Sequence, residues 1–141
     1  MRLTTRSRYG AMILLDIALN GDHGPVRTED IANRRMISKK YLEKLLRRLK
    51  DGGYITSKPG PGGGHMLKLA AKDIRIGEVF KSLDGDGDQD FDCGPGSDGC
   101  QRAAVCLART MWQEAWAAVY KSLNVYTLDD LIRDFNLCPK R

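Results

Sequence analysis

The sequence predicts a mainly α-helical protein with one small β-hairpin. Three stretches carry this prediction: an apolar run over residues 11–19, a helical apolar repeat over residues 38–50, and a glycine-rich turn over residues 60–64 between two β-prone runs. Helix, short helix, helix and hairpin, in this order, are the elements of a winged helix-turn-helix. We therefore expect such a module, with the hairpin as its wing, followed by a long helix.

The first two helices are separated by a cluster of helix breakers at residues 21–25. We expect the first helix over about residues 5–20, with one face formed by Ala11, Leu14, Leu15, Ala18 and Leu19. Thr28 is the expected N-cap of a short second helix through Arg34, with Ile31 and Ala32 facing inward.

The helix expected over residues 38–50 has one apolar and one basic side. Ser38 is its expected N-cap. The apolar side consists of Leu42, Leu45, Leu46 and Leu49, and the opposite side consists of Lys39, Lys40, Glu43, Lys44 and Arg47. A recognition helix follows a short helix and a tight turn, so this helix is predicted to meet DNA rather than to be an ordinary solvated surface.

Glu43 is the one acidic residue on this basic side. Lysine and arginine can address guanine O6 and N7 or phosphate, whereas a carboxylate can accept a hydrogen bond from cytosine N4. A negative charge facing DNA weakens binding unless it reads a base, so Glu43 is the predicted specificity residue.

The predicted hairpin pairs residues 54–57 with residues 65–69 across a tip of Gly60, Pro61, Gly62 and Gly63. Taken alone, the tip could be a phosphate-binding loop, but it lacks the Lys-Ser/Thr ending of that motif and a strand follows it. A wing that lies against the DNA backbone fits better, because glycine lets backbone N–H groups approach phosphates.

The second half of the chain is expected to contain three more helices. A short helix over residues 76–83 precedes a loop over residues 84–101, which has almost no apolar content. A long helix over about residues 102–123 carries Val105, Trp112, Trp116, Val119, Tyr120 and Leu123. Thr127 and Asp130 resemble a capping box for a last helix through Asn136.

Charge is divided unevenly along the 141 residues. Residues 1–75 carry 16 Lys and Arg against 7 Asp and Glu, whereas residues 76–141 carry 7 against 11. This division indicates that only the first half meets a polyanion. We expect a DNA-binding region over residues 1–75 and a cysteine loop with dimerisation helices over residues 76–141, both within one continuous compact unit.

The composition also argues against a membrane protein, an exported protein and an enzyme. No segment approaches the roughly 20 apolar residues of a membrane span. Asp16 interrupts the apolar run that follows Arg8, and no small-residue cleavage site follows it, so we expect a cytoplasmic chain with reduced cysteines. The only histidines, His23 and His65, are not placed as partners for a cysteine nucleophile.

Cys93, Cys100 and Cys106 have the spacing Cys-x6-Cys-x5-Cys in and just after the glycine-rich acidic loop. Three thiols in such a loop, ending at a helix start, suit an iron–sulfur cluster. Structural zinc usually shows closer cysteine pairs. The alternative is three unrelated cysteines, with Cys106 in a helix core.

Several of these motifs together resemble the IscR-type, or Rrf-two, family of transcription regulators. The similarity rests on Met1–Arg2–Leu3–Thr4, Arg8–Tyr9, Ile37–Ser38, Tyr41–Leu42–Glu43, the glycine-rich turn, Ile76–Gly77–Glu78–Val79, the three cysteines and Trp112. It covers nearly the whole chain. It implies a homodimer that binds pseudo-palindromic double-stranded DNA, dimerises through the long helix, and holds a cluster with Cys93, Cys100 and Cys106 as its metal ligands.

Residue analysis and resemblance together predict one DNA interface. Its members are Arg2, Thr4, Arg8, Tyr9, Ser38, Lys39, Lys40, Tyr41, Glu43, Lys44, Arg47, Lys58, Gly60, Pro61, Gly62, Gly63 and His65. Pro59 stands where relatives often have an arginine, and Lys58 is its expected replacement in the minor groove.

The ligand set departs from the family pattern in two places. Arg109, a permanent cation, stands where cluster-binding relatives carry a ligand histidine, and Arg8 stands where some relatives supply a carboxylate. Cys138, Asp92, Asp98 and an exogenous group are the remaining candidates for the fourth ligand. Three cysteines without a histidine favour a four-iron over a two-iron cluster.

The leading functional hypothesis is therefore a DNA-binding regulator that uses a cluster to sense redox state, nitric oxide or iron. The alternative is a regulator of the same family without a cluster, controlled by thiol chemistry, zinc or a protein partner.

Overall fold

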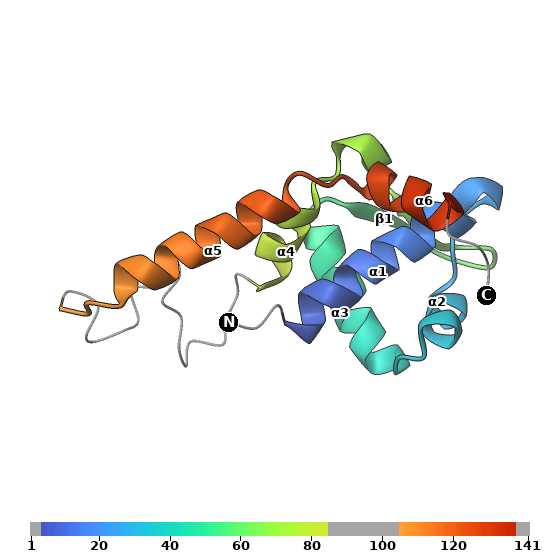
Figure 1. Cartoon of the computed structure of the whole chain (residues 1–141). Helices are drawn as coiled ribbons and strands as arrows, with labels where there is room; N and C mark the ends of the chain where they lie inside the picture. The colour runs from blue at the N-terminus through green and yellow to red at the C-terminus, as the bar shows by residue number, and fades with distance from the viewer. Residues whose placement is uncertain (1–3, 85–104, 138–141) are drawn as a thin grey trace.

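The structure is a computed structural model that describes residues 4–84 and 105–137. Four elements, α1 (Thr5–Asn20), α2 (Thr28–Arg35), α3 (Lys39–Asp51) and the hairpin of β1 (Ile55–Lys58) and β2 (Gly64–Leu67), form the winged helix-turn-helix. They are followed by α4 (Ile76–Asp84), α5 (Arg109–Leu123) and α6 (Leu128–Leu137), and two short 3-10 turns lie at Gly21–His23 and Ala71–Asp73. Figure 1 shows this order, and the predicted mainly α-helical fold with a small hairpin is confirmed.

Helix α1 begins and ends where the sequence predicts. Thr4 caps it by accepting a hydrogen bond from the backbone N of Ser7. The predicted face was partly wrong, because Ile13 and Ile17 are fully buried with Leu14, while Ala11, Leu15 and Ala18 only flank the core. The reason is that α1 contacts α2, α3, α4 and α6, so it is buried over a wider arc than one face.

The turn between α2 and α3 passes through Met36, a non-glycine residue in the left-handed region with φ of 54°. The predicted cap of α2 was wrong, because Arg27 occupies the N-cap position and makes no side-chain cap hydrogen bond. Thr28 is the first helical residue instead, and its hydroxyl bonds to His65 of the wing. Ile31 is fully buried, as predicted.

Helix α3 agrees closely with its sequence pattern. The hydroxyl of Ser38 accepts a hydrogen bond from the backbone N of Tyr41, which confirms the predicted cap. The four leucines of the apolar side are buried, and Gly52 follows the last turn. The basic side therefore faces away from the core.

The wing is a two-stranded antiparallel sheet in which Ile55 pairs with Leu67 and Lys58 pairs with Gly64. β1 begins and ends one residue later than predicted, and β2 begins one residue earlier and ends two residues earlier. Outside the named strands, the backbone N of Lys68 donates to the carbonyl of Tyr54 at 2.9 Å. At the tip, Gly60 and Gly62 have φ of 92° and 76°. These angles favour glycine, so a side chain at either position would be strained.

Helices α4 and α6 belong to the same hydrophobic core as α1, through Val79, Leu83 and Leu128. The predicted capping box of α6 is confirmed: the backbone N of Thr127 donates to Asp130 Oδ2 at 2.8 Å, and the backbone N of Asp130 donates to the Thr127 hydroxyl at 3.2 Å. An isolated bridge between Arg75 and Thr127 then holds the start of α6 beside the start of α4.

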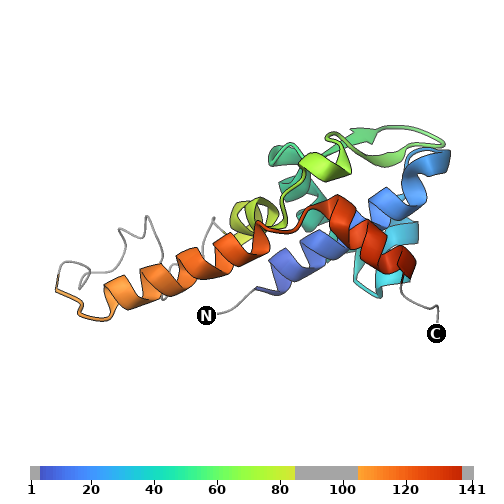
Figure 2. The same cartoon turned by 45° about the horizontal axis from the view of Figure 1, so that its top comes forward.

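Helix α5 projects from the rest of the described structure, as Figures 1 and 2 show from two directions. It begins at Arg109, later than predicted, because residues 105–108 form a turn. Val105 and Leu107 in this turn are exposed, so no core packing stabilises an earlier helical turn there. Among the helices that the structure describes, none is long and apolar enough to span a bilayer.

Candidate nucleic-acid interface

The predicted contact residues of α3 lie along one exposed side of that helix. Lys40, Glu43, Lys44 and Arg47 are all exposed, and the leucines hold their backbone against the core. Because the helix is packed along its length, these side chains start from fixed positions. Such an array can contact base edges and phosphates without folding on binding.

Lys39 differs from its neighbours because its ammonium lies 2.7 Å from Glu29 of α2. The hydrogen bond and charge of Glu29 raise the pKa of Lys39, and Lys39 lowers the pKa of Glu29. Both side chains are exposed, and exposed pairs contribute about 0–1 kcal/mol. A DNA phosphate can therefore replace Glu29 as the partner of Lys39 at little cost.

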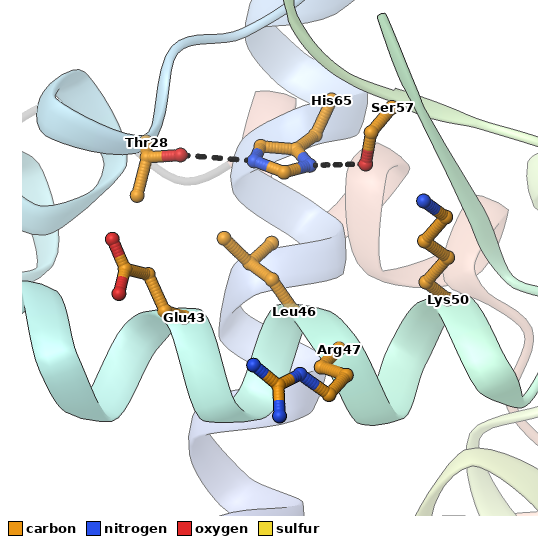
Figure 3. Close-up of a pocket in the computed structure, with 7 residues that line it drawn as sticks. All are labelled: Thr28, Glu43, Leu46, Arg47, Lys50, Ser57 and His65. Carbon is orange, nitrogen blue, oxygen red and sulfur yellow. Dashed lines mark hydrogen bonds between the residues drawn. The ribbon is translucent and has the colours of Figure 1, made fainter. Parts of the chain in front are cut away.

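A hollow separates α3 from the wing, and Figure 3 shows its inner wall. Glu43 and Lys50 rise from α3 toward the wing side, whereas Arg47 points away from His65 in this view. Thr28, Ser57 and His65 close the opposite wall. The hollow continues over Lys58 and the glycine-rich tip, residues 59–64. Helix α3 and the wing thus flank one groove.

His65 lies at the centre of that wall, with both ring nitrogens occupied. The Thr28 hydroxyl lies 2.9 Å from Nε2 and the Ser57 hydroxyl lies 3.0 Å from Nδ1. Burial lowers the pKa of His65, and the nearby charge of Lys50 lowers it further. The ring is therefore neutral at physiological pH.

The predicted contacts from the N-terminal part are placed away from this hollow. Arg8 is exposed, and Tyr9 packs edge-to-face on Tyr41 of α3, with ring centroids 6.0 Å apart. The Thr4 hydroxyl donates to a carboxylate oxygen of Asp84, so this side chain joins α1 to α4. Arg2 lies outside the described residues.

Eight residues that line the groove were missing from the predicted interface: Arg27, Thr28, Glu29, Leu46, Lys50, Ser57, Pro59 and Gly64. Lys50 could have been predicted from the sequence. Arg47 follows Glu43 by four positions and Lys50 follows Arg47 by three, so the three residues lie on the same side of a helix. Nothing local in the sequence marks Thr28 or Ser57, since their role depends on a histidine that pairing of distant segments brings to them.

Of the three predicted metal ligands, only Cys106 belongs to the described residues. It is half-buried in the turn before α5, and its carbonyl accepts from the backbone N of Arg109 at 3.2 Å. Cys93 and Cys100, with the fourth-ligand candidates Asp92, Asp98 and Cys138, lie outside the described ranges. Within residues 4–84 and 105–137, no group of three potential metal ligands comes together.

Helix α5 carries apolar side chains that the rest of the described chain leaves exposed. Met111 and Trp112 are 55% and 39% exposed, Leu107 in the preceding turn is 100% exposed, and no residue of α5 is fully buried. Only its C-terminal end reaches the core, through Tyr120 and Leu123. Trp116 stacks on Tyr120 within the helix, with ring centroids 5.8 Å apart.

Comparison with known sequences identifies one family over nearly the whole chain. The Rrf2 family of iron-dependent transcriptional regulators matches residues 3–134. Protein rrf2 of Nitratidesulfovibrio vulgaris is 51% identical over 140 residues, which cover 99% of this chain and 93% of that protein. The HTH-type transcriptional regulator IscR of Pectobacterium carotovorum is 40% identical over 134 residues, which cover 95% of this chain and 80% of that protein. These relatives are regulators and not enzymes.

Solved structures agree with the sequence comparison. T. potens IscR superposes with a TM-score of 0.77 at 25% identity, covering 100% of this chain and 93% of that chain. CymR, the global cysteine regulator of B. subtilis, gives 0.71 at 28% identity, with coverages of 94% and 97%. The oxidized form of Staphylococcus aureus CymR also gives 0.71, at 26% identity and with coverages of 94% and 96%.

Proposed function

This chain belongs to the Rrf2 family of transcriptional regulators, and we propose that it binds a pseudo-palindromic operator as a homodimer whose affinity depends on its cysteines. The observation that carries the proposal is the groove between the basic side of α3 and the glycine-tipped wing. Residues 1–75 supply the DNA contacts in this proposal, and residues 76–141 supply the cysteines and the dimer helix. Because the proposed operator is chromosomal DNA, we propose that the protein acts in the cytoplasm.

The DNA contacts divide by chemistry. Lys40, Lys44 and Arg47 on the exposed side of α3 enter the major groove and bind phosphates or guanine, while Glu43 accepts from a cytosine amino group. Lys58 and the tip glycines follow the backbone at the adjacent minor groove. Lys39 and Tyr41 add to the contacts of α3. The contact area extends beyond this helix through Ser38, Arg8, Tyr9, Thr4 and Arg2.

A second copy of this chain is the proposed partner of α5. Exposed Met111 and Trp112, with half-buried Trp116, make a projecting apolar surface, and apolar area of this kind favours association. Twofold pairing of α5 would also present two α3 helices to two half-sites of one operator. One winged helix alone would read too few bases to select an operator.

Cys93, Cys100 and Cys106 are the proposed ligands of an iron–sulfur cluster, and the IscR relatives support this assignment. Three thiolates suit iron and sulfide, and Arg109 cannot act as a ligand because its guanidinium stays protonated. A four-iron cluster with one iron open to an exogenous ligand fits this donor set better than a two-iron cluster. Such a cluster supplies sensitivity to oxygen, nitric oxide or iron supply.

A second candidate keeps the DNA function and replaces the cluster by thiol chemistry. The structural similarity to CymR, which has been solved in an oxidized form, favours this candidate. Zinc or a protein partner at the same cysteines would be further versions of it.

Three measurements on the full-length protein test the proposal. Selection from a random duplex library should enrich a palindromic sequence, and light scattering should give the mass of a dimer. Anaerobic isolation, followed by a visible spectrum and iron and sulfide analysis, should show the cluster. Absence of any enriched duplex would refute the DNA function, whereas a colourless protein that binds its operator would favour the thiol-controlled candidate.

A further inference from the structure

We propose that His65 is a positioning residue that holds the wing at a set orientation relative to the recognition helix, by hydrogen bonds to Thr28 and Ser57. The inference rests on the proposed DNA function and deepens it. It replaces a direct DNA contact by His65 with a role inside the protein.

Four hydrogen bonds join His65 to other elements. Its backbone N donates to the carbonyl of Val26 at 2.8 Å, and its carbonyl accepts from the N of Val26 at 2.9 Å. Its ring spans from Thr28, the first residue of α2, to Ser57 in β1. One residue of β2 is thereby joined to the segment before α2, to α2 itself and to the neighbouring strand.

The ring of His65 has no nitrogen left without a partner in the protein, so it has little to offer DNA. Both nitrogens have partners at hydrogen-bond distance, and a hydroxyl can serve either tautomer because it donates or accepts. The lowered pKa of His65 keeps the ring uncharged, so it adds no attraction for phosphate. A half-buried neutral ring with two internal partners suits a structural link.

The hydrogen bond from His65 ends on the first turn of α2, which also contacts α3. Thr28 and Glu29 are consecutive residues at the start of α2. Thr28 bonds to the wing through His65, while Glu29 forms an exposed ion pair with Lys39 at the start of α3. The first turn of α2 is therefore a shared support, and loosening its bond to His65 should free the wing more than it frees α3.

A double-mutant cycle tests this role on a duplex enriched from a random library by the wild-type protein. Lys58→Ala removes a wing contact, and Thr28→Val removes the hydroxyl that bonds to His65 while keeping the side-chain shape. We expect Lys58→Ala to weaken binding about fivefold in the wild-type background, which corresponds to one lost contact of about 1 kcal/mol. In the Thr28→Val background, where the wing is no longer held, the same change should cost less than about twofold.

Three variants complete the cycle. Thr28→Ser keeps the hydroxyl and should behave as the wild type. Ser57→Ala removes the other partner of His65, and it should reduce the effect of Lys58→Ala in the same way. Thr56→Val makes the same chemical change at the neighbouring position of β1, whose side chain points to the other face of the hairpin, so it should leave the effect at about fivefold.

The outcomes separate this inference from the proposed function. If the library enriches no duplex with the wild-type protein, the DNA function itself fails. If the wild type binds but Lys58→Ala costs the same in all backgrounds, or costs nothing in the wild type, the positioning role of His65 is overturned. A direct contact of Thr28 with DNA would give additive losses, which the cycle distinguishes from the expected coupling. If Thr28→Val unfolds, Ser57→Ala decides by the same criterion.

Discussion

Arg34, near the end of α2, binds the buried carboxylate of Asp16 in α1 with two nitrogens: Nη2 lies 2.6 Å from Oδ1, and Nε lies 3.2 Å from Oδ2. Arg35 also binds this carboxylate, from its Nε to Oδ2 at 2.9 Å. Asp16 is 1% exposed. One acid inside the fold therefore pairs with two of the arginines in the basic half, and these ion pairs join the first two helices.

Replacement of Asp16 by Asn should destabilise the protein markedly, because it leaves Arg34 and Arg35 without their counter-charge while changing little volume. We expect a loss of about 2–4 kcal/mol in the free energy of unfolding, toward the low end because the Arg34 side chain is partly exposed. Urea denaturation followed by circular dichroism measures it. Asp22→Asn, at an exposed acid, is the control and should change stability by less than about 0.5 kcal/mol. Equal stability of the two variants would contradict the role of Asp16.

Replacement of Lys44 by Ala should weaken binding to all duplexes alike. Lys44 is exposed on the outer side of α3, and a phosphate contact releases about one counterion. The slope of log affinity against log salt should therefore become shallower by about 0.9. A titration series in increasing salt gives this slope, and an unchanged slope would remove Lys44 from the interface. Lys72→Ala, at an exposed lysine in the 3-10 turn after the wing, is the control.

Replacement of Glu43 by Ala should have the opposite signature. Overall affinity should hold or rise, because a negative charge facing DNA is removed, while discrimination at one base pair should fall by about 1–3 kcal/mol. Sequencing of duplexes enriched by each protein measures this change. If the variant enriches the same sequence with the same stringency, Glu43 is an ordinary surface residue.

Replacement of Trp112 by Glu should give a monomer, because it places a charge in the projecting apolar surface of α5. Light scattering at micromolar concentration measures the mass, and operator affinity should fall together with dimerisation. Lys121→Glu changes an exposed residue on the opposite side of the same helix and should remain dimeric. A dimeric Trp112→Glu protein would move the interface elsewhere.

Single replacement of Cys93, Cys100 or Cys106 by Ala should abolish the visible absorption of anaerobically reconstituted protein, because each thiolate is a proposed ligand. Cys138→Ala should keep it, and air should bleach the wild type and change its DNA affinity. A Cys100→Ala protein that keeps its spectrum would favour the alternative without a cluster. Loss of the spectrum in Cys138→Ala would identify the fourth ligand.

Much of the fold could be predicted from local pattern. The ends of α1, the cap and buried leucines of α3, the glycine-rich tip and the Thr127–Asp130 capping box all follow from residues close together in the chain. Such features depend on backbone hydrogen bonds and on one periodic face, both of which a short window contains. The side of α3 that is exposed follows from the same periodicity.

Tertiary structure decided the features that depend on pairs of distant residues. Asp16 interrupts an apolar run in the sequence, and only the packing of α2 on α1 brings two arginines to it. Threonine is a common N-cap residue, but folding brings His65, 37 positions later, to the Thr28 hydroxyl and gives that hydroxyl another partner. Helix α5 begins late because nothing in the described fold packs on Val105 and Leu107. Local spacing sets which groups a segment offers, whereas desolvation and hydrogen bonding across the fold determine which of those groups remain free to meet DNA.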